Sequence, residues 1–346
     1  ISKIRNENYD FPMKYLPVKP DSIRKKYNLN TTPCAIITTR GCINTCSFCT
    51  VSLGKSVCCS SQEYAIEEIK YLVNEYNVDH LLINDADFLL SSNRAFRLIK
   101  MIKQIGAIRK ISVNSCVKSI NKISKNDFEE LLEGIEWEIE LGIESVNEDQ
   151  LKRYNKKTTV SENFQALDYL FDLQKQIKLT ILIDFILFDP YSSLHEFNDF
   201  IKFYKRYHLD TIEYEGMIKS NILLFPGTKI RERVIADGLA IDQPGIANYK
   251  FLNKNVADLF GAISYFDIEM MPVVNSMRNN LKHLAKDLIS STKLFKTYKL
   301  LSTLNSIKFN LFEDLYNCAG ERSTITLTLK QYMKNIEIYQ GIIKNL

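Results

Sequence analysis

Long hydrophobic runs, histidine and tryptophan are scarce in this chain of 346 residues. There are four histidines and one tryptophan, and the histidines show no paired metal-site spacing. The longest apolar stretch, Leu179 to Phe188, is interrupted by Asp184 and is far shorter than the ~20 residues that a membrane-spanning helix needs. No secretion signal is recognisable, so we expect a cytoplasmic protein without membrane contact. Position 1 is Ile rather than Met, which suggests an excerpt of a longer product.

The charges also lack a dominant sign or a long basic run. Lysine and arginine total 45 against 41 aspartates and glutamates, a net charge of +4 with the two signs interspersed. No nucleic-acid partner is therefore expected. Hydrophobic residues make up 45% of the chain, enough for a full core. In a cytoplasm the eight cysteines are expected as reduced thiols, where clustering indicates metal binding or catalysis more often than disulfides.

Short apolar or alternating runs recur between amphipathic segments, a pattern typical of repeated βα units. Serine and threonine caps three residues ahead of an acid predict helix starts at Ser60, Thr159 and Ser193. Six strands are predicted, at Cys34–Thr39, His80–Asn84, Ile111–Cys116, Glu136–Ile143, Lys178–Phe188 and Thr211–Met217. Strands that alternate with helices imply a parallel sheet, and six units suit an incomplete barrel.

The alternation within the strands indicates which face the helices cover. In the fourth strand, Trp137 and Ile139 point one way while Glu136, Glu138 and Glu140 point the other. Helices must cover the apolar side, so a polar, acidic side faces the barrel interior. A sheet of antiparallel strands with one solvated face is the alternative, which the intervening helical segments disfavour.

We therefore expect an α/β fold, a partial (β/α)6 TIM-like barrel with a C-terminal helical appendage. The predicted domains are an extended, proline-containing lead-in over residues 1–32, the partial barrel over 33–240 and a helical region over 241–346.

Directly after the first strand, cysteines are spaced C-x3-C-x2-C at Cys42, Cys46 and Cys49. Three thiolates on one short loop can ligate three irons of a [4Fe-4S] cubane, which leaves the fourth iron open to a small chelating molecule. A structural zinc site is the alternative, but it needs four ligands, and the adjacent Cys58 and Cys59 would have to reach back across the loop. The spacing alone leaves both readings open.

At these residues the sequence resembles the radical S-adenosylmethionine (SAM) superfamily, whose signature has this spacing and an aromatic residue, here Phe48, before the last cysteine. Similar segments follow in order at Ile83–Phe88, Glu140–Ser145, Leu151 with Asn155 and Lys156, Phe185–Pro190 and Leu224–Thr228. The resemblance covers residues 33 to about 240. It is nearest to the branch associated with cobalamin-binding domains. No such domain lies in this sequence, so the resemblance leaves the use of cobalamin open.

The resemblance implies roles for particular residues. Asp85 or Asp87 would accept hydrogen bonds from the methionyl ammonium, with capping of the helix near Ser91 as the structural alternative. Phe48 would pack beside the adenine, unless it is a core residue. The remaining expected contacts are Glu144 and Asp184 with ribose hydroxyls or the methionyl amine, and Lys156 with the carboxylate, unless Lys156 occupies a solvated helix position.

Two positions fit the resemblance less clearly. Phe188 stands where the family commonly has glycine, which puts a close backbone approach to adenine in doubt. Cys116 is either a hydrogen-atom donor to substrate or a small buried residue.

The resemblance implies reductive cleavage of SAM at the cluster to a 5′-deoxyadenosyl radical, which abstracts hydrogen from a peptide or small-molecule metabolite, as in peptide or natural-product maturation. The alternatives are a cobalamin-dependent methyltransferase and a non-catalytic iron–sulfur protein. Methylthio transfer to RNA is disfavoured because there is no second cysteine cluster or basic C-terminal module. A flavodoxin or ferredoxin would supply the electron.

Overall fold

The structure, a computed structural model, describes residues 4–5, 34–54, 56–209, 215–241, 245–287 and 291–344. The chain divides into two compact units. The first comprises residues up to Glu144 together with Leu151–Asp184, and the second comprises Ser145–Gln150 and Phe185–Leu346. The predicted lead-in over residues 1–32 falls almost entirely outside the described residues, and the predicted domain boundaries at residues 32 and 240 remain predictions.

A five-stranded sheet forms the centre of the first unit, with the strand order β2-β5-β6-β7-β8. Its strands are β2 (Cys34–Ile36), β5 (His80–Ile83), β6 (Lys110–Cys116), β7 (Glu136–Glu144) and β8 (Leu179–Phe185). The pairings from β2 through β7 are parallel, with Ile111 opposite Trp137 and Cys116 opposite Gly142. This arrangement confirms the α/β class and the parallel sheet.

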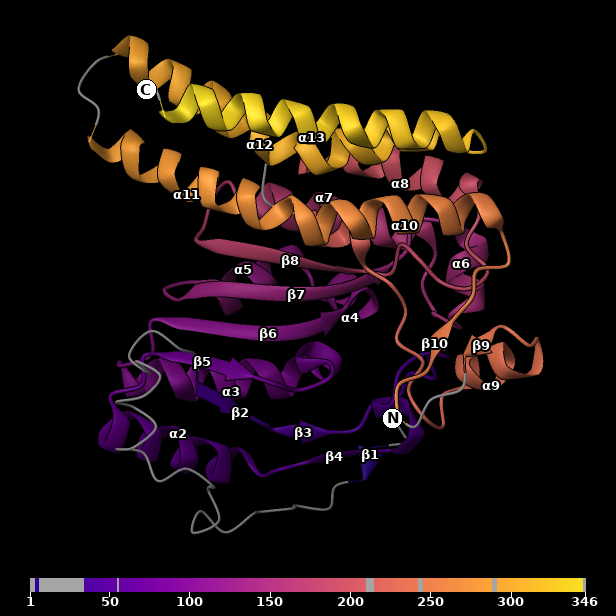
Figure 1. The fold of residues 1–346 in the computed structure, drawn as a ribbon. Coiled ribbons are helices and arrows are strands. Elements are labelled where there is room, and N and C mark those ends of the chain that lie inside the picture. The colour runs from indigo at the N-terminus through magenta and orange to yellow at the C-terminus, as the bar shows by residue number, and fades with distance from the viewer. Residues whose placement is uncertain are drawn as a thin grey trace. The chain divides into compact units, whose positions relative to one another are not determined.

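Helices between these strands cover one face of the sheet (Figure 1). They are α2 (Gln62–Tyr76), α3 (Ser92–Ile105), α4 (Val117–Lys122), α5 (Lys125–Leu132) and α7 (Val160–Leu173), with the short 3-10 helices η2 (Val51–Gly54) and η3 (Phe88–Leu90) and helix α6 (Glu148–Arg153) at the connections. The predicted alternation is confirmed in β7, where Trp137 and Ile139 are buried while Glu138 and Glu140 remain partly exposed.

Local capping rules predicted two of three helix starts correctly. Thr159 and Ser193 each form a capping box with the glutamate three residues later, at the starts of α7 and α8. The prediction at Ser60 was wrong by one residue, because Ser61 caps α2 by accepting from the Tyr64 N–H. The hydroxyl of Ser60 instead donates to the Thr38 carbonyl at 3.2 Å.

The strand bounds required further corrections. The first predicted strand is divided into β2 and β3 (Thr39–Arg40), and β3 joins a small sheet with β4 (Val57–Cys59) and β1 (Ile4–Arg5) that the sequence did not reveal. The fifth strand ends at Phe185, three residues earlier than predicted. Most of the predicted sixth strand, residues 211–214, lies outside the described part. Its last residues form the 3-10 helix η5 (Glu215–Lys219) rather than a strand.

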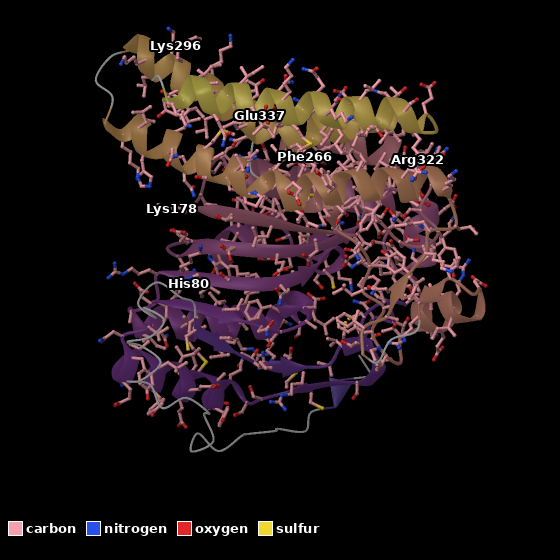
Figure 2. The ribbon with its side chains drawn as sticks, in the orientation of Figure 1. His80, Lys178, Phe266, Lys296, Arg322 and Glu337 are labelled. Atoms are coloured by element: carbon pink, nitrogen blue, oxygen red, sulfur yellow. The ribbon has the colours of Figure 1, made fainter. Side chains whose placement is uncertain are left out.

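A polar network fills the amino ends of the strands on the less covered face of the sheet. The ring nitrogen of His80 lies 2.8 Å from the Ser112 hydroxyl, which donates to Glu138 at 3.0 Å. Lys110 completes the network with an ion pair to Glu138 at 3.0 Å. Figure 2 labels His80 at this edge, so the network lies at the opposite end of the strands from the cysteine motif.

The second unit is largely helical. Its helices are α8 (Leu194–Arg206), α9 (Lys229–Ala236), α10 (Lys254–Glu269), α11 (Met271–Asp287), α12 (Ser291–Asn317) and α13 (Arg322–Lys344). Two short antiparallel strands, β9 (Ala240–Ile241) and β10 (Asn248–Tyr249), also pair in this unit. The predicted C-terminal helices are thus confirmed. Phe188, the departure from the family pattern, is fully buried here, with its ring centroid 5.0 Å from those of Phe197 and Phe260. A large side chain at this position therefore serves the core of this unit.

Within the described residues, no helix is both long and apolar enough to cross a bilayer.

Candidate active site at the carboxyl ends of the strands

Cys42, Cys46 and Cys49 lie on the loop between β3 and η2, which we call the cysteine loop (residues 41–50). The loop begins at Gly41, whose φ of +89° is in the left-handed region. A Cβ at this position would lie 1.9 Å from the Ser56 carbonyl oxygen, so no larger residue fits. All three cysteines are free thiols with partial exposure.

The segment that follows α6 holds the cysteine loop from the other side. The side-chain amide of Asn155 donates to the Thr45 carbonyl at 2.7 Å and to its hydroxyl at 2.9 Å. The Ser47 N–H donates to the Tyr154 carbonyl at 2.8 Å. These bonds, between residues more than a hundred positions apart, place the loop beside the carboxyl end of β7.

Lys156, the next residue of that segment, forms an ion pair with Glu144 beside the cysteine loop. Its Nζ lies 3.3 Å from Glu144 Oε1, and their side chains are only 9% and 12% exposed. Gly142 makes room for this pair, since a Cβ there would lie 3.1 Å from Glu144 Oε1 and 3.2 Å from Lys156 Nζ. Glu144 has a φ of +65°, a strained conformation for a residue with a side chain.

The electrostatics of this pair extend to the thiols. Burial opposes the charge of Lys156, but the negative charge of Glu144, assisted by Cys116 and Cys46, outweighs it and raises the lysine pKa. Burial raises the pKa of the Cys46 thiol to about 11, and the Lys156 ammonium opposes this shift. Lys156 is therefore a fixed positive charge that favours a thiolate at Cys46.

Asp85 connects the start of the cysteine loop to the sheet. Its fully buried carboxylate accepts from the Thr38 N–H at 2.7 Å, the Thr38 hydroxyl at 2.6 Å and the Thr39 N–H at 2.8 Å. Arg94 holds the same threonine, donating to its hydroxyl at 3.0 Å and its carbonyl at 3.1 Å. Asp85 is thus already engaged in fixing the strand that leads into the motif.

Asp87 is engaged in a similar way at the end of β6. Its carboxylate accepts from the Ser119 hydroxyl at 2.7 Å, the Ser115 hydroxyl at 3.2 Å and the Cys116 N–H at 3.3 Å. Burial raises its pKa, although these hydrogen bonds oppose the shift. Neither aspartate caps the helix near Ser91 through its side chain, since α3 has no side-chain cap bond.

Asp184, near the end of β8, has an unusual protonation equilibrium. Desolvation of the carboxyl group is the largest cause of a raised pKa, and the negative charges of Glu140 and Glu144 add to it. Together they raise the pKa of Asp184 to about 8. The residue still keeps substantial contact with solvent. Because the side chain is exposed, crowding by the like charges of Glu140 and Glu144 is the cause that this geometry supports most directly, and it favours the protonated form of Asp184.

Phe48 contacts the same segment as the loop backbone. Its ring meets that of Tyr154 edge to face, with centroids 5.6 Å apart and planes inclined by 80°. The ring is only partly buried. Part of the Phe48 side chain therefore remains accessible.

The three loop cysteines suit a group that needs three separate thiolates. Each of Cys42, Cys46 and Cys49 interacts electrostatically with the others, which places the three thiols close together. Within the described residues, no three histidine, cysteine or acidic side chains converge on a single ion. A cubane binds each thiolate to a different iron, so its ligands need not converge on one point. Three cysteine thiolates that do not converge on a single point therefore fit a [4Fe-4S] cluster better than a zinc ion.

Comparison with known proteins agrees with this geometry. Residues 36–204 match the family model described as the radical SAM superfamily. The segment that holds the site is thus a radical SAM domain. The matched range contains every predicted cofactor-binding residue as well as the three loop cysteines.

Two kinds of relative extend the comparison. An uncharacterised methyltransferase of Pyrococcus horikoshii is 30% identical over 220 residues, which cover 62% of this chain and 45% of that protein. The structure of OxsB, a cobalamin-dependent SAM radical enzyme, with aqua-cobalamin bound has a TM-score of 0.66 at 17% identity, covering 90% of this chain and 54% of OxsB. A second OxsB structure, with SAM also bound, has the same TM-score at 18% identity. The likeness to OxsB shows a shared fold, and the chain spans about half the length of these relatives.

The structure brings together most of the residues that the sequence singled out, and it adds several. Cys42, Cys46, Glu144 and Lys156 are neighbours, and their roles remain predictions. Glu140, Asn44 and Arg94 also belong to the site and its supports. Only Glu140 had a signal in the sequence, because the strand alternation placed it on the polar face.

Replacing Gly41 by alanine should prevent cluster loading. The left-handed backbone costs an L-residue roughly 1–2 kcal/mol, and the contact with the Ser56 carbonyl would displace the loop. We expect iron and acid-labile sulfide per chain to fall sharply in Gly41→Ala after anaerobic reconstitution. Gly54→Ala is the matched control, because a Cβ at Gly54 meets nothing within 4 Å. Equal iron content in the two variants would contradict this role of Gly41.

Asp184 should make the stability of the chain dependent on pH. Its folded pKa of about 8 exceeds its ordinary value of 3.8, so between these values the folded state holds a proton that the unfolded state has lost. Stability should therefore fall as pH rises through this window. Asp184→Asn removes this contribution, so the melting temperature of the variant relative to the wild type should rise between pH 5 and pH 8. A constant difference across this range would contradict the raised pKa.

Proposed function

We propose that this chain is a radical SAM enzyme that cleaves SAM reductively and abstracts hydrogen from a peptide or small-molecule metabolite. The observation that carries the proposal is the cysteine loop itself. It presents three free thiols, fixed by Gly41 and Asn155, next to a buried ion pair.

The residues of the chain divide into two groups in this proposal. Cys42, Cys46 and Cys49 would hold a [4Fe-4S] cluster. When bound, that cluster supplies the single electron that splits SAM to a 5′-deoxyadenosyl radical. Polar and aromatic groups beside the loop would bind SAM: Glu144, Lys156 and Asp184 its ribose and methionyl groups, and Phe48 its adenine.

Asp85 and Asp87, which follow β5, support the site in this proposal and do not bind SAM directly. Asp85 is buried and its carboxylate already accepts three hydrogen bonds. It would therefore act by holding Thr38 and Thr39, and through them the cysteine loop. Asp87 would act by fixing the end of β6. The direct contact with the methionyl ammonium predicted for one of them is better supplied by Glu144, whose carboxylate lies at the loop.

The central test is the release of 5′-deoxyadenosine. The chain is reconstituted anaerobically and supplied with SAM and either dithionite or a flavodoxin or ferredoxin system, and 5′-deoxyadenosine is quantified by mass spectrometry. The wild type should release it, and Cys46→Ala should not. Cys318→Ala, which removes a cysteine of the second unit, should match the wild type. Release no greater than that of Cys46→Ala would contradict the proposal and favour a non-catalytic iron–sulfur protein.

A cobalamin-dependent methyl transfer is the second candidate. It is supported by the methyltransferase name of the Pyrococcus horikoshii relative and by the cobalamin dependence of the protein that shares this fold. The match covers 45% of the first relative and 54% of the second.

Methyl transfer predicts a distinct isotopic result. With SAM deuterated in its methyl group and hydroxocobalamin added, the chain should retain a corrinoid absorbance through desalting and transfer deuterium to the product. Hydrogen abstraction alone predicts unlabelled product, with 5′-deoxyadenosine and methionine as the two fragments of SAM. Absence of both corrinoid retention and label in the product would eliminate this candidate for the chain.

A further inference from the structure

A fourth thiol lies against the cysteine loop. The side-chain amide of Asn44 donates to Cys116 Sγ at 3.5 Å, while its backbone N–H donates to Cys42 Sγ at 3.4 Å. One loop residue therefore spans the distance between these two sulfurs. Cys116 also interacts electrostatically with Cys42, Cys46 and Lys156. Cys116 therefore lies beside Cys42 and Cys46 of the loop.

The position of Cys116 is set by the sheet and not by the loop. It is the last residue of β6, opposite Gly142 in the parallel register. Its N–H donates to the buried carboxylate of Asp87 at 3.3 Å. The thiol thus approaches the loop cysteines from the strand ends, a direction that the three loop ligands themselves do not occupy.

Other cysteines of the first unit do not share this setting. Cys34 has Glu68 as its charged neighbour, and Cys59 has Arg94, Asp85 and Cys58. Cys116 is therefore distinguished by its neighbours and not merely by being a cysteine. An ordinary core position would surround it with apolar atoms, whereas here an amide group points at its sulfur.

We propose that Cys116 is the resting-state ligand of the iron that the C-x3-C-x2-C motif leaves open, and that SAM displaces it on binding. This inference rests on the proposed function, because it requires a [4Fe-4S] cluster on Cys42, Cys46 and Cys49. Iron–sulfur clusters commonly take four cysteine thiolates, so a nearby thiol is a chemically suitable fourth ligand.

The exchange is a ligand substitution without electron transfer. The bond between iron and Cys116 Sγ would break, and the amino and carboxylate groups of SAM would take its place. The methionyl ammonium loses one proton as its nitrogen binds, and the released Cys116 thiolate takes up one proton, so the exchange is neutral in protons and electrons. Cys116 would therefore protect the open iron from oxidants and adventitious ligands until SAM arrives. Cys116 would also compete with SAM for this coordination position on the iron.

The first experiment compares the clusters of two proteins without SAM. Wild type and Cys116→Ala are reconstituted with 57Fe and transferred to buffer without added thiol, and their Mössbauer spectra are recorded. The wild type should show only sulfur-coordinated iron, and a distinct nitrogen- and oxygen-coordinated site should emerge only after SAM is added. Cys116→Ala should show a distinct site from the start. A distinct site in the SAM-free wild type would overturn the proposal, and this measurement does not require the variant to fold.

The second experiment measures the competition. If Cys116 occupies the iron in about nine-tenths of the molecules, its removal should tighten the apparent Kd for SAM about tenfold, because the binding-competent fraction rises accordingly. SAM is titrated while the electron paramagnetic resonance of the reduced cluster is recorded, with Cys318→Ala as the matched control. Equal or weaker SAM binding in Cys116→Ala would overturn the proposal.

These results separate the inference from the proposed function. A wild type that assembles no cluster would fail both. A wild type that releases 5′-deoxyadenosine, with spectra and SAM affinity unchanged by Cys116→Ala, would fail this inference alone. If that variant kept these properties but lost conversion of substrate, Cys116 would instead be a hydrogen-atom donor, which also overturns the proposal.

Discussion

The hydrogen bonds that join Asn155 and Tyr154 to the cysteine loop are the constraint on which the rest of the site depends. They join two segments more than a hundred residues apart, and they bring Lys156 to Cys46. A loop of this length has no regular structure to hold it, so its shape must come from such long-range partners. The turn at Gly41 sets its start, and Asp85 fixes the strand before it. These contacts within the protein therefore position the thiols.

The charges beside the cysteine loop complement this positioning of the thiols. A buried ammonium is costly unless it is paired, and Lys156 is paired with Glu144 at 3.3 Å. Three thiolates on one loop would add negative charge beside Glu144, which a neighbouring cation offsets. The strain at Glu144 and the missing side chain at Gly142 are both consistent with a site built around this ion pair. The position of one lysine thus links the fold of the segment after α6 to the chemistry of the loop.

The features that could be predicted from the sequence are those that depend on neighbouring residues. The capping box of Thr159 and Glu162 and the alternation in β7 follow from local rules, and both are present. The cysteine spacing is likewise local. By contrast, the proximity of Cys116 to Asn44 joins positions 72 residues apart and depends on the register of β6. Local rules also failed at residues 215–217, where a polar alternation predicted strand and the chain forms a 3-10 helix.

The same distinction changes how the acidic residues of the site should be understood. A sequence motif shows that carboxylates recur at strand ends, but not which of them are already engaged. Asp85 is fully used by Thr38 and Thr39, whereas the like charges near Asp184 raise its pKa and favour its protonated form. A carboxyl group that is protonated at neutral pH can donate a hydrogen bond as well as accept one. Asp184 is therefore better suited than Asp85 to bind a ligand with both donors and acceptors, such as a ribose. Some carboxylates on the acidic face of the sheet thus hold the protein of the site together, and others remain available to bind a ligand.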